Sequence, residues 1–147
     1  MAVEIRVEYQ GDLHCRATHG PSGVMLTTDA PLDNGGKGER FSPTDLVATG
    51  LGTCILTVLG LFARRRGLDL TGATAHVTKE MAAAPLRRIS RLTVTVTLPP
   101  GLELSQKDRA VVEGVADLCP VKQTLHPDVA VEIRVVDPAR VSPAGTS

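Results

Sequence analysis

The sequence predicts an α+β domain in which antiparallel sheets pack on a long, buried central helix. Three observations predict this fold class. Short stretches before residue 28 and longer ones over residues 70–98 alternate apolar with polar side chains, as half-buried strands do. Between them, residues 46–62 carry no charge. The chain has 147 residues, so we expect one domain over residues 1–138 and a flexible C-terminal tail over residues 139–147.

The N-terminal part is predicted to form a meander of three short antiparallel strands. In residues 3–9, valine and isoleucine alternate with glutamate and arginine. Two turns then separate a second strand over residues 13–19 from a third over residues 24–28. Residues 29–41 hold three glycines among small and polar residues, which indicates a surface loop rather than a regular element.

A long helix is predicted to begin at Ser42 and to run to about Arg66. Ser42 suits the N-cap, Pro43 the first helical position and Asp45 the acidic position of a capping box. Gly67 is a typical helix stop. Because the helix is apolar on all sides, we expect it to be buried on all sides. A domain this small can hardly surround it, so we expect an obligate homodimer with this helix near the shared core.

The second half of the chain is predicted to hold two longer strands, two helices and a last strand. The strands cover residues 70–82 and 86–98, and in the latter leucine and valine alternate with threonine. A serine with an aspartate three residues on begins a helix over residues 105–118. A short helix over residues 120–125 and a strand over residues 129–136 follow.

Composition excludes several classes of partner and location. Sixteen basic residues balance sixteen acidic ones, so we expect no nucleic acid and no anionic membrane as partner. The uncharged run of the long helix is at the low end of the ~20 apolar residues that a membrane span needs, and glycines and threonines dilute it. Three cysteines are too few for a disulfide framework, and the N-terminal residues show no apolar signal segment. We therefore expect a cytoplasmic protein.

The usual catalytic motifs are absent, which leaves the cysteines as candidates for chemistry. Cys119 directly precedes Pro120, so its sulfur is expected at the N-cap of the short helix, where the helix dipole favours a thiolate. A cap without chemistry is an equal alternative. Cys54 lies in the long helix among apolar neighbours, where a small buried hydrophobe is the ordinary interpretation. However, Gly50 and Gly52 leave room beside its sulfur for another element or a small substrate.

Two segments around these cysteines resemble the signatures of the OsmC/Ohr family, the osmotically inducible protein C-like and organic hydroperoxide resistance proteins. Residues 42–54, which read SPTDLVATGLGTC, are similar to the family's Pro-x-[Glu/Asp]-Leu helix start that leads to a buried cysteine. Residues 119–125, which read CPVKQTL, look like its second signature. The resemblance covers nearly the whole chain, up to Val136. It implies the OsmC-like fold, an intertwined homodimer with two active sites at the interface.

The resemblance also implies a peroxidase that reduces organic hydroperoxides with two cysteines and no metal or prosthetic group. It makes Cys54 the peroxidatic cysteine and Cys119 the resolving one. Arg16 resembles the arginine that the family sets beside the reactive thiol, where a guanidinium would favour the thiolate. Cys54 would become a sulfenic acid, Cys119 would condense with it to a disulfide, and a dithiol reductant would restore both thiols.

One position departs from the family pattern. Ohr-type members place a glutamate ten residues before the first cysteine, where it orients the arginine. Here Thr44 occupies that position and Asp45 follows it. Asp45 precedes Cys54 by nine residues, roughly half a turn away around the helix at about 3.6 residues per turn. Asp45 is therefore either the partner of Arg16 or only the cap of the helix.

Two other functions stay open at this point. The apolar dimer interface could hold a fatty-acid-like or other small hydrophobic ligand, with thiols that sense redox state at most. In the third interpretation both cysteines are inert and the chain forms only a packed dimer. This interpretation predicts slow thiol labelling and no disulfide between Cys54 and Cys119 after peroxide treatment.

Overall fold

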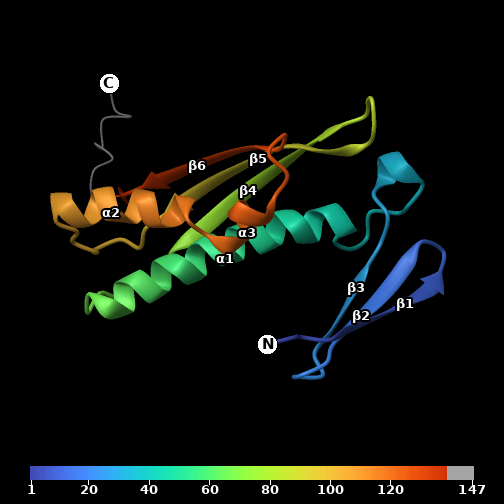
Figure 1. Ribbon diagram of the computed structural model, residues 1–147, viewed down its shortest axis with the longest axis horizontal. Coiled ribbons are helices and arrows are strands. Elements are labelled where there is room, and N and C mark those ends of the chain that lie inside the picture. Colours follow the sequence, from blue (N-terminus) through green and yellow to red (C-terminus); the bar gives the residue numbers. More distant parts are fainter. Residues whose placement is uncertain (139–147) are drawn as a thin grey trace. The chain divides into compact units, whose positions relative to one another are not determined.

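The computed structural model describes residues 1–138 (Figure 1). The predicted tail over residues 139–147 lies outside this range. The chain divides into two compact units, residues 1–47 and the chain from Ala48 onward, and each contains a three-stranded sheet. The long helix α1, Pro43–Arg65, begins in the first unit and continues in the second. The predicted α+β class is confirmed by these two sheets and the long helix.

The sheet of the first unit has the order β1-β2-β3 with both pairs antiparallel, which confirms the predicted meander. Its strands are β1 (Ile5–Gly11), β2 (His14–His19) and β3 (Met25–Thr28). The first hairpin turns at Asp12 and Leu13, whose φ angles are 54° and 62°. A two-residue hairpin loop of this kind needs positive φ at both positions, so Leu13 lies in the turn rather than in the predicted strand.

The loop after β3 folds back on itself around a single turn of 3₁₀ helix, η1 (Leu32–Asn34). Gly36 lies against the backbone of Ala30 so closely that a Cβ would stand 1.8 Å from the Ala30 carbonyl oxygen. The Gly36 N–H donates to the carbonyl of Pro31 at 3.0 Å. Only glycine fits this approach, so the predicted surface loop has a defined path.

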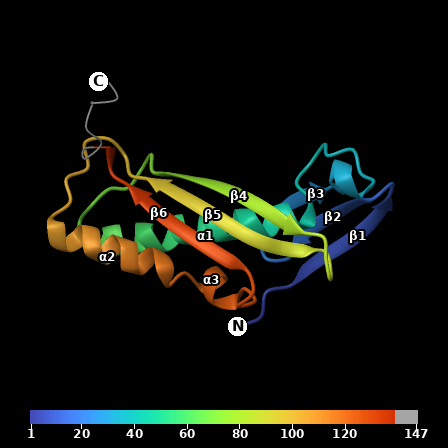
Figure 2. The same ribbon diagram turned by 90° about the horizontal axis from the view of Figure 1, so that it is seen from above.

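The sheet of the second unit has the order β4-β5-β6. β4 (Thr74–Ala82) and β5 (Arg88–Thr97) are antiparallel, whereas β6 (Ala130–Val136) runs parallel to β5 (Figure 2). This pair differs from the antiparallel sheets that the sequence predicts. The connection from β5 to β6 contains the helices α2 (Gln106–Asp117) and α3 (Pro120–Thr124), and a connection of that length allows a parallel crossover.

One hydrophobic core holds the second unit together. The predicted alternation in β5 is confirmed, because its apolar side chains are fully buried and the threonines between them are half-buried. α1 and α2 contribute the other fully or nearly fully buried side chains, and Cys119 belongs to the same cluster. The principal members are Leu51, Ile55, Leu59, Leu92, Val94, Val96, Val112 and Ala116.

α1 begins and ends as predicted. The Ser42 Oγ accepts the N–H of Asp45 at 3.1 Å, and the Asp45 carboxylate accepts the N–H of Ser42 at 2.9 Å, which is a capping box. At the other end Gly67 has a φ of 68°, and the N–H of Leu68 donates to the carbonyl of Ala63 at 2.9 Å. This left-handed glycine stop is common at helix ends.

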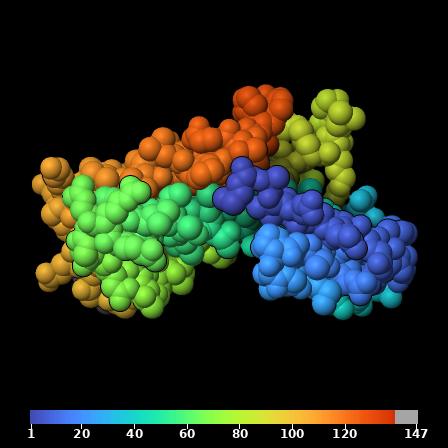
Figure 3. All heavy atoms as spheres, turned by 60° about the horizontal axis from the view of Figure 1, so that its bottom comes forward, coloured from blue at the N-terminus to red at the C-terminus, as the bar shows by residue number. Residues whose placement is uncertain are grey.

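Within the single chain α1 is buried along one face only, so burial of its other face, which the sequence predicts together with a homodimer, stays a prediction. Thr53, Thr57 and Leu61 lie on the exposed face of α1. Figure 3 shows part of α1, coloured teal to green, at the surface. The Thr53 hydroxyl donates to the carbonyl of Thr49 at 2.9 Å, and that of Thr57 donates to the carbonyl of Thr53 at 2.8 Å. The exposed face is therefore a mildly apolar surface whose hydroxyl protons are already bonded.

Among the helices of residues 1–138, α1 alone is long and apolar enough to cross a membrane by length and composition. Core helices of globular proteins pass the same test. Six residues of α1 are buried in the chain, all on the face that packs into the core. The helix is thus accounted for by packing into the hydrophobic core, and residues 1–138 show no clear membrane-protein character.

Gly52 and Gly50 form a matched pair for testing how closely α1 packs on the sheet. A Cβ at Gly52 would meet the Val77 Cγ2 at 2.8 Å, whereas a Cβ at Gly50 would meet nothing within 4 Å. We expect Gly52→Ala to lower the free energy of unfolding by about 1–2 kcal/mol, because overpacking costs more than the gain in helix propensity. We expect Gly50→Ala to raise it by up to about 1 kcal/mol. Urea denaturation of both variants checks this, and equal stability would contradict the close approach.

Candidate functional site

Cys54 lies in the middle of α1 and is half-buried, at the edge of the hydrophobic core. One turn earlier on the same side of the helix, Gly50 carries no side chain, and the space that a Cβ would occupy there is open. Gly52, two residues before Cys54, lies instead directly against Val77 of β4. The two glycines therefore have different roles. Gly52 allows close packing of α1 on β4, and Gly50 leaves open space near the Cys54 sulfur.

Cys119 is fully buried and caps α3, as the sequence predicts. Its Sγ accepts the N–H of Lys122 at 3.3 Å, and Pro120 occupies the first helical position. The side chains that follow tie α3 to the end of α2. Lys122 pairs with the carboxylate of Asp117, and the Gln123 Nε2 donates to the Asp117 carbonyl at 3.1 Å. These contacts fix where the Cys119 sulfur lies.

The two cysteines meet inside the second unit. The Cys119 thiol lies close enough to Cys54 for that residue to influence its pKa, although the two residues are far apart in the sequence. Burial raises the pKa of Cys119, and the neighbouring Cys54 raises it further, while the N–H groups of Lys122 and Val121 lower it. The raised pKa corrects the expectation that the N-cap position would favour a thiolate, because desolvation of a fully buried sulfur outweighs two backbone N–H groups.

Arg16 and Asp45 are both in the first unit. Arg16, on β2, pairs with Glu8 of β1 at 3.4 Å, and both side chains are largely exposed. The Asp45 carboxylate takes part in the capping box with Ser42. The approach of Arg16 or Asp45 to Cys54 stays a prediction. The third cysteine, Cys15, is half-buried on β2 and is not a member of the hydrophobic core cluster.

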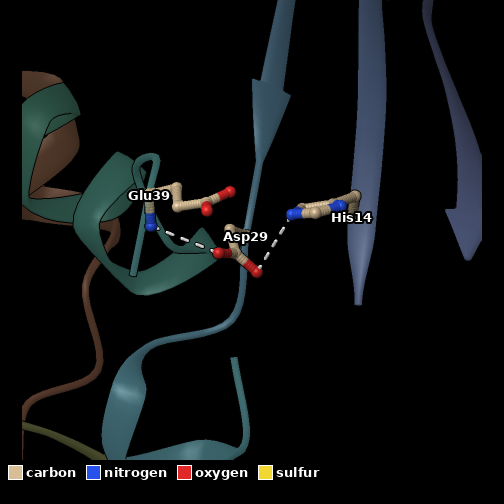
Figure 4. A group of neighbouring side chains, drawn as sticks. All are labelled: His14, Asp29 and Glu39. Atoms are coloured by element: carbon tan, nitrogen blue, oxygen red, sulfur yellow. Dashed lines mark hydrogen bonds and ion pairs between the residues drawn. The ribbon is translucent and has the colours of Figure 1, made fainter. Parts of the chain in front are cut away.

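Sequence reasoning missed the residues that brace the Cys119 turn and a group of possible metal ligands. Lys122 and Gln123 lie within the second signature, but nothing in their spacing shows that both bind Asp117. In the first unit, His14, Asp29 and Glu39 bring one ligand atom each to within 4.8 Å of one another (Figure 4). The histidines have no metal-like spacing in the sequence, so this group becomes visible only when β2 and β3 are paired.

The chain is similar to a known family over most of its length. A family model described as OsmC-like protein matches residues 36–134. Among solved structures, a candidate osmotic stress induced and detoxification response protein from Psychrobacter arcticus 273-4 is 45% identical, with a TM-score of 0.84. The similarity covers 90% of this chain and 94% of that one. Among curated proteins, none matches the chain.

Two more distant solved structures share the fold. An organic hydroperoxide resistance protein OsmC from Legionella pneumophila is 16% identical, with a TM-score of 0.72 over 92% of this chain and 96% of that one. An organic hydroperoxide resistance candidate from Vibrio cholerae, with captopril bound in one of its active sites, is 17% identical. Its TM-score is 0.71 over 92% of this chain and 91% of that one. At this identity the likeness concerns the fold alone.

Proposed function

The chain belongs to the OsmC-like protein family, and on this premise we propose that it is a thiol-dependent peroxidase that reduces organic hydroperoxides in oxidative stress defence. The observation that carries the proposal is the proximity of Cys54 and Cys119 in the hydrophobic core of the second unit. Once one cysteine is oxidised to a sulfenic acid, a neighbouring thiol can condense with it to a disulfide and water without help from a cofactor.

In the first step, the Cys54 thiolate attacks the O–O bond of the hydroperoxide. The terminal oxygen is transferred to sulfur and yields a sulfenic acid, while the other oxygen leaves as an alkoxide and takes up a proton to become the alcohol. Cys54 is thus oxidised by two electrons and the hydroperoxide is reduced by two. The open space at Gly50 supports this assignment, since it lies one turn from Cys54 on an apolar helix.

In the second step, the Cys119 sulfur attacks the sulfenic sulfur of Cys54. The S–S bond forms, the S–O bond breaks, and the departing hydroxide leaves as water with the proton of Cys119. The raised pKa of Cys119 keeps this proton on the sulfur beforehand, so the two adjacent sulfurs do not both carry a negative charge. A dithiol reductant then restores both thiols by exchange.

Arg16 is proposed to supply the positive charge beside Cys54, with Asp45 as its orienting partner or only as the helix cap. The pair of Arg16 with Glu8 joins two largely exposed side chains at 3.4 Å. Such surface pairs contribute about 0–1 kcal/mol, so exchanging Glu8 for another partner costs little. A reducing cytoplasm, the proposed location, would keep the thiols ready for the next turnover.

We propose that the protein acts as a homodimer that covers the exposed face of α1. Thr57→Arg places a charge in the middle of this face, so we expect it to give a protein with half the molar mass of the wild type. Ala83→Arg, at an exposed position between β4 and β5, is the matched control and should keep the dimer mass. Light scattering after size-exclusion chromatography measures both variants. A wild-type mass of one chain would contradict the proposal.

Stopped-flow kinetics of the reduced protein tests the proposed activity. We expect cumene hydroperoxide to react at least about tenfold faster than hydrogen peroxide, the order of discrimination that apolar contacts supply. Peptide mapping of the product should find one disulfide, between Cys54 and Cys119. No reaction, together with a hydrophobic ligand retained in native mass spectrometry, would favour a binding protein of the same fold instead.

A further inference from the structure

His14, Asp29 and Glu39 come together in the first unit through strand pairing. The register of β2 and β3 pairs Cys15 with Thr28, and one step further along the same pair His14 lies beside Asp29. Glu39 comes from the loop after β3, where its N–H donates to the Asp29 Oδ2 at 3.2 Å. Figure 4 shows the Glu39 carboxylate extending above Asp29 toward the His14 ring. Three potential ligands, from the start of β2, the residue after β3 and the loop that follows, therefore surround one space.

The Asp29 side chain is only 1% exposed and is half satisfied. Its Oδ2 accepts two backbone N–H groups, those of Lys37 and Glu39, at 3.2 Å each. Neither its Oδ1 nor the His14 Nε2 that faces it makes a hydrogen bond, although the two atoms stand at ion-pair distance from each other. Buried polar atoms that make no hydrogen bond are rare and costly in folded proteins. We therefore expect a further binding partner for the Asp29 Oδ1 and the His14 Nε2.

The separation of these two atoms fits two ligands of one cation better than a hydrogen bond. The His14 Nε2 and the Asp29 Oδ1 are 3.4 Å apart, beyond the about 2.7–3.2 Å of an N–H···O bond. Two ligands on a tetrahedral zinc ion, with bonds of about 2.0–2.2 Å, stand about 3.3–3.6 Å apart. The Glu39 ligand atom lies within 4.8 Å of the other two, and its side chain is exposed, so a rotamer change completes the set.

We propose that His14, Asp29 and Glu39 bind a divalent first-row transition metal ion, with zinc as the best fit. One imidazole and two carboxylates make a donor set of intermediate softness, which suits zinc or manganese better than calcium or copper(I). Backbone N–H groups that hold the second oxygen of Asp29 would fix the orientation of this ligand, as outer hydrogen bonds do in metal sites.

A metal ion at this place would fasten the loop after β3 to β2. Asp29 already closes the loop through the N–H groups of Lys37 and Glu39, and the ion would add His14 of β2 as an anchor. The ion binds the folded unit and not the unfolded chain, so it raises thermal stability in proportion to the logarithm of its concentration. The proposal is independent of the peroxidase chemistry, because it uses neither Cys54 nor Cys119.

Zinc titration of the metal-free full-length protein by calorimetry tests the site. The background is the variant in which Cys15, Cys54 and Cys119 are serine, so that only nitrogen and oxygen ligands remain. We expect one zinc ion per chain and a rise in melting temperature on binding. His14→Gln and Glu39→Gln should each weaken binding by at least about tenfold to a hundredfold. The matched controls His19→Gln and Glu4→Gln, at exposed positions of the same unit, should leave it unchanged.

Manganese binding to the wild-type chain, followed by the loss of the free-ion electron paramagnetic resonance signal, gives a second measurement that keeps all three cysteines. Circular dichroism confirms that each variant is folded, and Asp29→Asn is included only if it passes this check, because Asp29 is buried. Binding of zinc by His14→Gln and Glu39→Gln as tightly as by the three-serine parent, and of manganese as tightly as by the wild type, would overturn the proposal. So would the absence of stoichiometric binding by the folded parent proteins.

Discussion

Replacing Cys54 with serine is expected to reduce hydroperoxide consumption to the uncatalysed rate. Serine keeps nearly the size and the helix position of the side chain. However, its hydroxyl is not ionised at neutral pH, and without a sulfur atom it cannot form a sulfenic acid. The measurement is the disappearance of cumene hydroperoxide in the presence of a dithiol, with wild-type and variant protein at the same concentration.

Cys15→Ser is the matched control for this experiment. Cys15 lies on β2 of the first unit, is half-buried like Cys54, and is not a member of the core cluster to which Cys119 belongs. We expect this variant to consume hydroperoxide at the wild-type rate. Undiminished turnover by Cys54→Ser would refute the proposed function, and a large loss in Cys15→Ser would move the reactive sulfur to the other unit.

Replacing Cys119 with serine is expected to separate the two proposed steps. Cys54 should still react with the first equivalent of hydroperoxide, but no disulfide can form. Mass spectrometry should then show the addition of one oxygen atom to the chain, trapped by a sulfenic acid reagent, where the wild type loses two hydrogen atoms. With excess peroxide, Cys54 should proceed to the sulfinic acid, and sustained turnover should be lost.

The fold must be checked before this loss is assigned to chemistry, because Cys119 also caps α3. Serine is a good N-cap residue, so the hydrogen bond to the Lys122 N–H should persist in the variant. We expect the melting temperature to change little. If the Cys119→Ser variant formed a disulfide between Cys54 and Cys15 and turned over normally, the resolving role would belong to Cys15.

Much of the fold could be predicted because local signals agree with the packing. The capping box of Ser42 and Asp45, the alternation in β5 and the position of Cys119 before Pro120 each depend on a few neighbouring residues. The direction of β6 could not be read from its sequence, because alternation predicts a strand and not its partner's orientation. The one-sided burial of α1 within the chain has a similar cause, since an apolar residue shows only that it tolerates burial.

The candidate sites likewise include features that the sequence predicts and features that it does not. The two signatures singled out Cys54 and Cys119, and the structure brings their thiols together. The direction of the Cys119 pKa could not be predicted, because it depends on burial by the whole core rather than on the helix end. The group formed by His14, Asp29 and Glu39 depends on strand register and loop path, which no sequence spacing reveals.

The sulfur that caps α3 is also the sulfur that would close the disulfide. In the reduced chain the Cys119 Sγ accepts the Lys122 N–H and so anchors a helix of five residues. A bond to Cys54 would redirect the Cys119 sulfur and weaken it as the acceptor of the Lys122 N–H. In each proposed catalytic cycle the first turn of α3 would then loosen on oxidation and re-form on reduction. The backbone conformation of this turn would thus differ between the two oxidation states, and an incoming reductant would recognise the oxidised one.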